Sequence, residues 1–487
     1  LSKASSSLRS KLGESLASVQ KFDVPIEATT TSLEALKAFS MGVATGDTKG
    51  DAAAIPFFKH ALELDPNFAM AYAGLGVHYR NMGQASLASE NIIKAYSLRD
   101  RVSEHEKYRI AALYYNYVTG ELDQAIQTYE LWTRSYPQDS TPPNNLGVIY
   151  TELGQYEKGL TETRESVELE PNVGIYYTNA ADLNLALGRP NEAEKNLRDA
   201  SDRKLDADEV HWLKYQLGFY KGDVAEMQRQ LDWAAGKPGD EDLLLCFQSD
   251  TEAYFGRLTK ARDFSRRAVD SAVRNNSKES AALWQMNSAL REAEFGNTAV
   301  AKQDIAAALA LAPGRDVKLF AALASARVGD VAHAKPFVDE LEKNYPSDTI
   351  LKVYWLPTIK AAMELDDNNP AQAIVALEAA APYELGGPPQ MQEGTMYPAY
   401  IRGEAQLAAH NGAAAATEFQ KFLDHRGVTL NEPLGALAHL GLARAYALEG
   451  DTAKARAAYN DFFTLWKDAD PDIPILVAAK SESAKLK

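Results

Sequence analysis

Apolar and small residues recur along most of the chain in pairs of short helical patterns, and the stretch 144–172 shows one pair clearly. Leu146, Gly147 and Tyr150 fall on one side of a first helix, at the spacing of an α-helical face. Gly154 interrupts the pattern, a second helix follows, and Pro171 ends it because proline lacks an N–H and fixes φ. One such hairpin is too small to bury its apolar face alone, so the sequence predicts that hairpins stack on one another.

The same hairpin recurs with a nearly constant period. A small residue early in the second helix marks most units, and five of the eleven intervals between successive marks are 34 residues. The marks are Ala54, Ala88, Ala125, Gly159, Ala193, Met227, Ala261, Ala301, Ala334, Ala373, Ala415 and Ala455. A 34-residue helix–turn–helix period is that of the tetratricopeptide repeat (TPR). We therefore expect an all-α TPR solenoid of about twelve repeats, with the right-handed superhelix of that repeat class.

The pattern also predicts the organisation of the chain. Residues 1–22 suggest an N-terminal amphipathic helix, 23–34 a linker, 35–471 the solenoid, and 472–487 a helix that covers the last repeat. Within the solenoid, 381–398 is a loop rich in proline and glycine. The tenth unit is weak because Pro357 falls inside its first helix.

Charge and composition exclude several classes of partner. The chain has 51 basic and 67 acidic residues, a net charge of −16, and no basic run that could neutralise phosphates. We therefore expect no nucleic-acid partner. No window approaches the ~20 apolar residues of a membrane span, so no direct membrane contact is expected from this chain. The single cysteine, Cys246, excludes a disulfide framework.

No motif of catalysis or metal binding is present in the sequence. None of the eight histidines belongs to an HExxH motif or to a close pair with a third ligand, and no GxSxG occurs. Acidic pairs such as Asp366-Asp367 fall near turns, where carboxylates cap helices. We expect no enzyme, no cofactor and no metal site.

The remaining candidate is the concave groove that the first helices of stacked hairpins line. Aromatic and amide side chains fall at its inward positions, where amides can bind a peptide backbone and aromatics supply contact area. These residues are Arg80, Asn81, Tyr114, Tyr117, Asn144, Asn145, Thr178, Asn179, Asp182, Trp212, Gln216 and Phe219. The alternative is that the aromatics pack between repeats and the amides are merely solvated. Arg80 and Lys107 are the only obvious inner basic residues of the first half, which speaks against a carboxylate clamp.

Two stretches carry a more specific resemblance. LGESLASVQKFDVP, within 12–42, and FFTLWKDADPDIPIL, within 383–480, resemble segments of the TPR region of a group of bacterial serine/threonine protein kinases. In that family a cytoplasmic kinase domain is followed by one membrane span and a C-terminal TPR array. The resemblance covers essentially the whole chain, all within the TPR part. The kinase motifs are absent, and 424–426 (DHR) and 262–264 (RDF) only echo them.

The resemblance implies that this chain is the C-terminal, non-catalytic half of a longer kinase and that it lies in an extracytoplasmic (periplasmic) compartment. The residues themselves do not determine the compartment. Two functions follow from the sequence. One is a module that binds a protein or peptide, or senses a ligand, in the concave groove. The other is a structural scaffold that self-associates through its ends or through the 381–398 loop.

Overall fold

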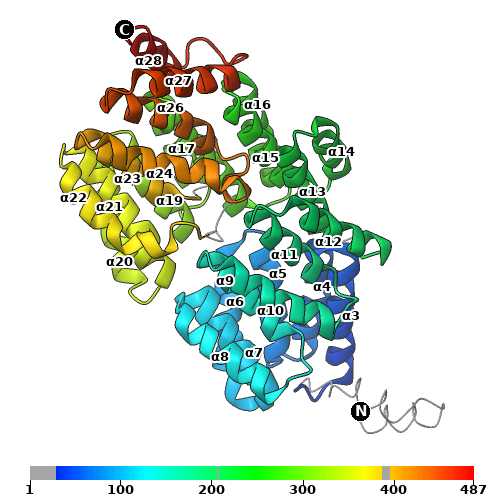
Figure 1. Cartoon of the computed structure of the whole chain (residues 1–487). Coiled ribbons are helices and arrows are strands. Elements are labelled where there is room, and N and C mark those ends of the chain that lie inside the picture. Colours follow the sequence, from blue (N-terminus) through cyan, green and yellow to red (C-terminus); the bar gives the residue numbers. More distant parts are fainter. Residues whose placement is uncertain (1–28, 206–207, 387–394, 487) are drawn as a thin grey trace.

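The computed structural model describes residues 29–205, 208–386 and 395–486, and these form an all-α solenoid of helical hairpins (Figure 1). In these ranges there are twenty-six α-helices and no β-strand, and twenty-four of the helices pair into twelve hairpins. The predicted fold, an all-α TPR-like solenoid, is confirmed. The predicted N-terminal helix and most of the linker, 1–28, lie outside the described residues.

Successive helices form the hairpins. The first six pair α3 (Leu33–Lys49) with α4 (Asp51–Leu64), α5 (Ala69–Asn81) with α6 (Ala85–Ser97), α7 (Glu104–Tyr114) with α8 (Leu122–Ser135), α9 (Thr141–Glu152) with α10 (Tyr156–Leu169), α11 (Gly174–Ala186) with α12 (Pro190–Asp202), and α13 (Asp208–Lys221) with α14 (Val224–Ala234). The last six pair α15 (Asp240–Tyr254) with α16 (Leu258–Arg274), α17 (Lys278–Glu294) with α18 (Thr298–Leu311), α19 (Arg315–Arg327) with α20 (Val331–Asn344), α21 (Leu356–Asp366) with α22 (Pro370–Ala376), α23 (Tyr397–Ala408) with α24 (Gly412–Asp424), and α26 (Pro433–Leu448) with α27 (Thr452–Leu465). The short α25 (Arg426–Thr429) precedes the twelfth hairpin and α28 (Pro474–Ser483) follows it.

Small residues let the two helices of a hairpin approach closely. A Cβ placed on Gly147 of α9 would overlap Thr163 Oγ1 of α10 and would lie 3.1 Å from the carbonyl oxygen of Gly159. On α5, a Cβ on Gly76 would overlap Ile92 Cγ1. The small positions of the sequence pattern therefore mark the helix–helix contacts, where extra volume forces strain.

The hairpins depart from regular geometry where the sequence pattern weakens. The first helix of the tenth hairpin begins as a π-helical turn, η3 (Leu351–Trp355), and continues as α21. Pro357 lies in the first turn of α21, directly after this π-helical turn, where it cannot donate the backbone hydrogen bond of a continuous α-helix. A similar turn, η2 (Tyr115–Thr119), ends α7, and the start of the Pro/Gly-rich loop forms a 3₁₀ segment, η4 (Leu377–Tyr383).

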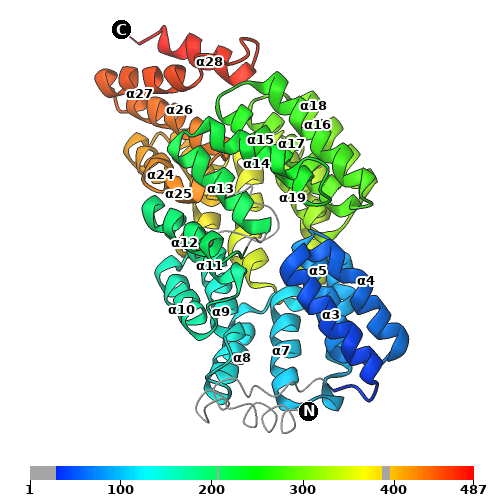
Figure 2. The same ribbon diagram turned by 90° about the vertical axis from the view of Figure 1, so that its right-hand side faces the viewer.

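The superhelix folds so that its second turn touches its first. Figures 1 and 2 both show α3–α12 in the lower part of the molecule and α23–α28 in the upper part. Four hairpin turns form hydrogen bonds with segments that lie 193 to 229 residues later in the chain. We call this line of contacts the seam. It joins the turns 82–86, 120–122, 154–156 and 254–259 to the segments 277–280, 348–349, 385–386 and 466–470.

Backbone groups make many of the seam contacts. The Thr349 N–H donates to the Gly120 carbonyl at 2.8 Å, and the Asp470 N–H donates to the Gly256 carbonyl at 3.0 Å. The Ser280 hydroxyl donates to the Met82 carbonyl at 3.0 Å. These bonds satisfy carbonyls at the hairpin turns that helix geometry leaves without a partner.

Glycine at the hairpin turn lets the second superhelical turn come this close. Gly120 has a φ of 68°, and a Cβ there would overlap the Asp348 carboxylate. Gly188, in the fifth hairpin, has a φ of 70°, but no other atom lies within 4 Å of a Cβ placed there. The two positions share one backbone conformation, and only Gly120 faces the seam.

Alanine substitutions at Gly120 and Gly188 distinguish the stability that the seam contributes from the cost of the left-handed turn conformation. Both substitutions put a residue with a Cβ in the left-handed backbone conformation, which costs about 1–2 kcal/mol of folding stability. We expect Gly120→Ala to cost a further ~1–3 kcal/mol because it overpacks the seam. Urea unfolding measures the difference, and small-angle scattering should show a larger radius of gyration for Gly120→Ala only. Equal losses and equal radii for the two variants would show that the seam adds no stability.

Candidate functional site: the inner wall of the superhelix

All twelve predicted groove residues lie on the first helices of hairpins two to six, or on η2 that continues one of them. Neighbouring first helices contact one another along the stack. We call the surface that these residues form the inner wall. Most of the twelve belong to a polar chain, to a cation–π pair or to a group that packs between helices.

The polar chain consists of three asparagines and a tyrosine. The Asn179 amide donates to Asn144 Oδ1 at 2.8 Å, and the Asn144 amide donates to Asn145 Oδ1 at 3.3 Å. The Asn145 amide donates to the Tyr129 hydroxyl at 3.2 Å. Burial raises the pKa of Tyr129, so its hydroxyl stays neutral. Asn144 is buried, whereas Asn145 and Asn179 are half-buried.

Arg80 and Tyr117 form the cation–π pair. The Arg80 guanidinium lies 5.4 Å from the centre of the Tyr117 ring. Asn81, the next residue on α5, is exposed and donates from its amide to Asp51 at 3.1 Å. Tyr114 instead stacks on Tyr96 of the neighbouring hairpin, with ring centres 3.8 Å apart, so it packs between repeats.

The remaining wall residues from hairpins five and six contact neighbouring helices. The Thr178 hydroxyl is buried and donates to the Ile175 carbonyl of its own helix at 2.9 Å, and the Gln216 side chain is also buried. This corrects the expectation that these two side chains face an open groove. The Trp212 indole N–H donates to Asp240 at 2.8 Å, and the Phe219 ring packs edge-on against Tyr254.

Two carboxyl groups on the wall have raised pKa values. Burial raises the pKa of Asp182 to about 6. Burial also raises the pKa of Glu152 to about 7, although the nearby Arg80 charge favours the ionised form. Glu152 was not among the predicted residues. It follows Thr151 at the end of the first helix of hairpin four, where inward-facing positions are expected, so its position alone could have indicated it.

A segment of the Pro/Gly-rich loop reaches the turn of hairpin four and forms part of the seam. The Tyr156 hydroxyl donates to the Leu385 carbonyl, and a Cβ on Gly154 would lie 3.0 Å from the Gly386 nitrogen. Glu384, next to Leu385, is held from the other side by Arg402 and by Lys421, whose ammonium lies 2.7 Å away. Sequence reasoning placed this loop on the chain but not beside hairpin four, because the contact spans 229 residues. Residues 387–394 of the predicted loop lie outside the described residues.

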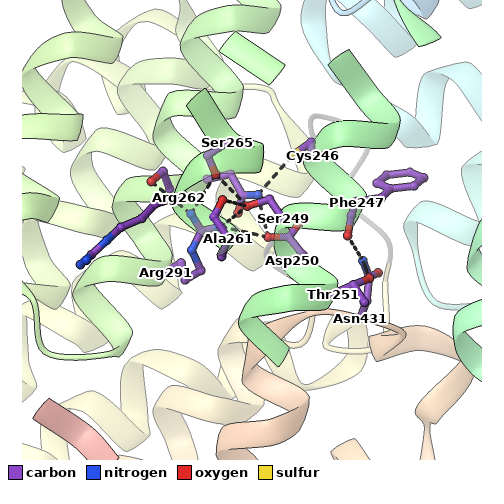
Figure 3. Close-up of polar contacts among 12 residues, drawn as sticks. Cys246, Phe247, Ser249, Asp250, Thr251, Ala261, Arg262, Ser265, Arg291 and Asn431 are labelled. Carbon is purple, nitrogen blue, oxygen red and sulfur yellow. Dashed lines mark hydrogen bonds and ion pairs between the residues drawn. The ribbon is translucent and has the colours of Figure 1, made fainter. Parts of the chain in front are cut away.

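A buried ion pair closes the inner face of hairpins seven and eight (Figure 3). Arg291 of α17 donates to the Ser249 hydroxyl at 2.8 Å and to the Ser265 hydroxyl at 2.9 Å, and it lies 3.4 Å from Asp250. The Asn431 amide, from the connection before α26, donates to the Phe247 carbonyl at 2.7 Å. The side chains of Arg291 and Asp250 are only 1 % and 6 % exposed, so the contact between α15 and α17 is part of the core.

In the part of the chain that the structure describes, His, Cys, Asp and Glu side chains nowhere gather in threes as metal ligands would. Its helices include none with the length and apolar character needed to cross a membrane.

Comparison with known proteins identifies the repeat. Residues 144–173 match the family model of the tetratricopeptide repeat. No curated protein matches the chain. Among solved structures, the chain is similar to yeast Tom70, at 13 % identity over 92 % of this chain and 95 % of that one, with a TM-score of 0.33. It is also similar to the APC/C hetero-tetramer Cut9–Hcn1, at 13 % identity over 93 % and 91 %, with a TM-score of 0.40.

The buried ion pair predicts a specific pattern of stability. Arg291→Met leaves Asp250 buried without its counter-charge, which should cost about 3–5 kcal/mol. Arg266→Met removes a guanidinium whose side chain is 65 % exposed, so its loss should stay within about 1 kcal/mol. The double variant Arg291→Met/Asp250→Leu should recover most of the loss, because it removes both charges together. Urea unfolding of the three variants measures these differences, and equal losses for Arg291→Met and Arg266→Met would contradict the assignment.

Proposed function

We propose that the chain is a protein-interaction module whose inner wall binds an extended segment of a partner protein. The observation that carries this proposal is the chain of asparagines on successive first helices. Asn145 and Asn179 are half-buried, and each amide offers donors and an acceptor to a peptide backbone. Hydrogen bonds of both amides to Asn144, and of Asn145 to Tyr129, hold the two side chains in fixed orientations, which reduces the conformational entropy lost on binding.

We further propose that the module is the C-terminal, non-catalytic part of a membrane-spanning bacterial serine/threonine kinase and lies outside the cytoplasm. The support is the resemblance of the stretches within 12–42 and 383–480. In such a receptor a partner bound to the array would favour one arrangement of its hairpins. The resulting shift of population would reach the kinase, and its size is limited by the difference in partner affinity between the two arrangements.

A second candidate function is a scaffold that self-associates end to end. α3 and α28 lie at opposite ends of the molecule (Figures 1 and 2). Each presents an exposed apolar side chain, Leu33 at 66 % and Val477 at 52 % exposure. Light scattering of the purified chain separates the two functions, since end-to-end association predicts a mass that grows with concentration and falls in Leu33→Ser/Val477→Ser.

Site-specific photo-crosslinking tests the inner wall. A photoreactive amino acid at Asn145 or at Asn179 should capture the same protein in cells. The same group at Arg198, whose side chain is 62 % exposed on α12, should not capture it. The captured protein, once purified, should bind Asn145→Ala/Asn179→Ala at least ~10-fold more weakly than the unaltered chain, because two hydrogen-bonding amides are lost. Equal capture from Arg198, or unchanged affinity, would exclude the wall as the binding surface.

The sequence upstream of this chain in its gene tests the proposed parentage separately. We expect a kinase domain with the catalytic HRD and DFG motifs, followed by one span of ~20 apolar residues. A parent that lacks both would remove the kinase proposal and leave the interaction module untouched.

A further inference from the structure

The first helix of the array, α3, presents an apolar face to solvent. Leu33, Met41 and Val43 are 66 %, 45 % and 42 % exposed, and no other helix of the described residues has three exposed large apolar side chains. The half-buried Leu36 and the exposed Ala44 lie on the same side of the helix as Leu33 and Val43, at helical spacing. We call these five residues the α3 face.

The position of α3 in the array explains why this face is uncovered. Each later first helix, from α5 to α26, packs on the second helix of the hairpin before it. The helices that pack most extensively on α3 are α4 and α5, and both follow it in the chain. A repeat array needs a unit that covers its terminal face and turns a polar side to water, so α3 lacks its counterpart among the described residues.

The sequence before α3 contains an apolar stripe of matching kind. Leu8, Leu12, Leu16 and Val19 recur at three- and four-residue spacing within the helix predicted over 1–22, which lies outside the described residues. Seven of these 22 residues are serine, which is a weaker helix former than alanine or leucine. Such a helix gains most of its stability by packing its apolar stripe on another surface.

The described chain begins beside α3 and therefore tethers this stripe close to the α3 face. The Thr29 N–H donates to Glu106 at 2.9 Å, and Ser32 caps the start of α3. Only residues 23–28 separate Thr29 from the predicted helix, and six residues span at most about 20 Å. The carboxyl end of the predicted helix is thus held near the start of α3, where Leu33 lies.

The polar residues of the segment suit a helix that covers the end of the array. The side opposite the apolar stripe carries Lys3, Ser6, Ser10, Glu14 and Lys21, which can face water. The segment has four basic residues and one acidic residue in a chain whose net charge is −16, so long-range electrostatics also favours its association with the rest of the chain.

We propose that residues 1–22 dock as an amphipathic helix on the α3 face and cover the open end of the solenoid. The helix runs antiparallel to α3, as the second helix of a preceding hairpin would, and its leucines pack on the α3 face. The docked segment covers Leu33, so it competes with the end-to-end association considered above. This inference depends neither on binding at the inner wall nor on the proposed kinase parentage.

Photo-crosslinking from the α3 face tests which segment covers it. A photoreactive amino acid at Val43 of the full chain should form a crosslink to a peptide from 1–22, identified by mass spectrometry. The same group at Leu131, which is 47 % exposed on the outer helix α8, should form no crosslink to 1–22. In a mixture of unlabelled and nitrogen-15-labelled chains, each crosslink should join two peptides of the same label, because the contact lies within one chain.

Two results of this experiment would overturn the proposal. Crosslinks that join labelled to unlabelled peptides would show that a second copy of the chain covers the α3 face. The absence of any crosslink from Val43 to 1–22 would show that the segment does not dock there.

Hydrogen exchange measures what the docked segment does to α3. Leu8→Ser/Leu12→Ser/Leu16→Ser removes the apolar stripe, so the amides of α3 should exchange at least ~10-fold faster than in the unaltered chain, because a terminal helix has lost its neighbour. The amides of α28, at the other end of the molecule, should exchange at the same rate in both chains. Equal exchange of α3 in both chains would contradict docking on the α3 face.

A matched control changes the other side of the same segment. Lys3→Ser/Glu14→Ser/Lys21→Ser alters three side chains opposite the apolar stripe and should leave the exchange of α3 unchanged. If this variant accelerates exchange as much as the leucine variant does, the apolar stripe is not the docking surface.

Discussion

The contact between the two superhelical turns is the constraint on which the rest of this structure depends. In an isolated repeat array each hairpin contacts only its neighbours, and stability is a sum of local terms. Here the Gly120 carbonyl binds the Thr349 N–H, and Tyr156 binds Leu385 from 229 residues away. Such contacts couple hairpins that are distant in the stack, so loosening one turn must strain another. The close approach leaves no room for a Cβ atom at the contact, which explains why the residue that faces Asp348 there is Gly120.

The closed turns determine what the interior can hold. When a second turn covers the first, polar residues that would face water in an open superhelix become buried. The structure satisfies them in pairs, such as Arg291 with Asp250, and Arg327 with Glu294 at 2.6 Å. A buried pair rarely adds stability over apolar packing, yet breaking one is expensive, so these pairs fix the arrangement of α15, α17 and α19 rather than strengthen it. Asn145 and Asn179, by contrast, remain only half-buried.

The sequence predicts those features that depend on one hairpin or on two neighbouring hairpins. The 34-residue period indicates the repeat, Gly147 marks a close helix contact, and Pro357 marks the unit whose first helix is irregular. Features that depend on the superhelical pitch are not predictable in this way. Pitch accumulates small rotations over many units, so no local pattern brings Glu152 of hairpin four beside Asp316 of hairpin nine. The prediction that Thr178 faces an open groove is wrong for a related reason. The position of a residue on a helix indicates the direction of its side chain but not what covers that side chain.

The inner wall and the seam are joined by shared residues. Arg80 and Tyr117 form a cation–π pair on the wall and also line a cavity of about 160 Å³ between hairpins two to four and hairpins eight and nine. A change in how the two superhelical turns pack would therefore move this pair, and with it the end of the wall at hairpins two and three. Coupling of this kind needs no contact between distant hairpins other than the seam, because each hairpin can stay folded while seam contacts are made or broken.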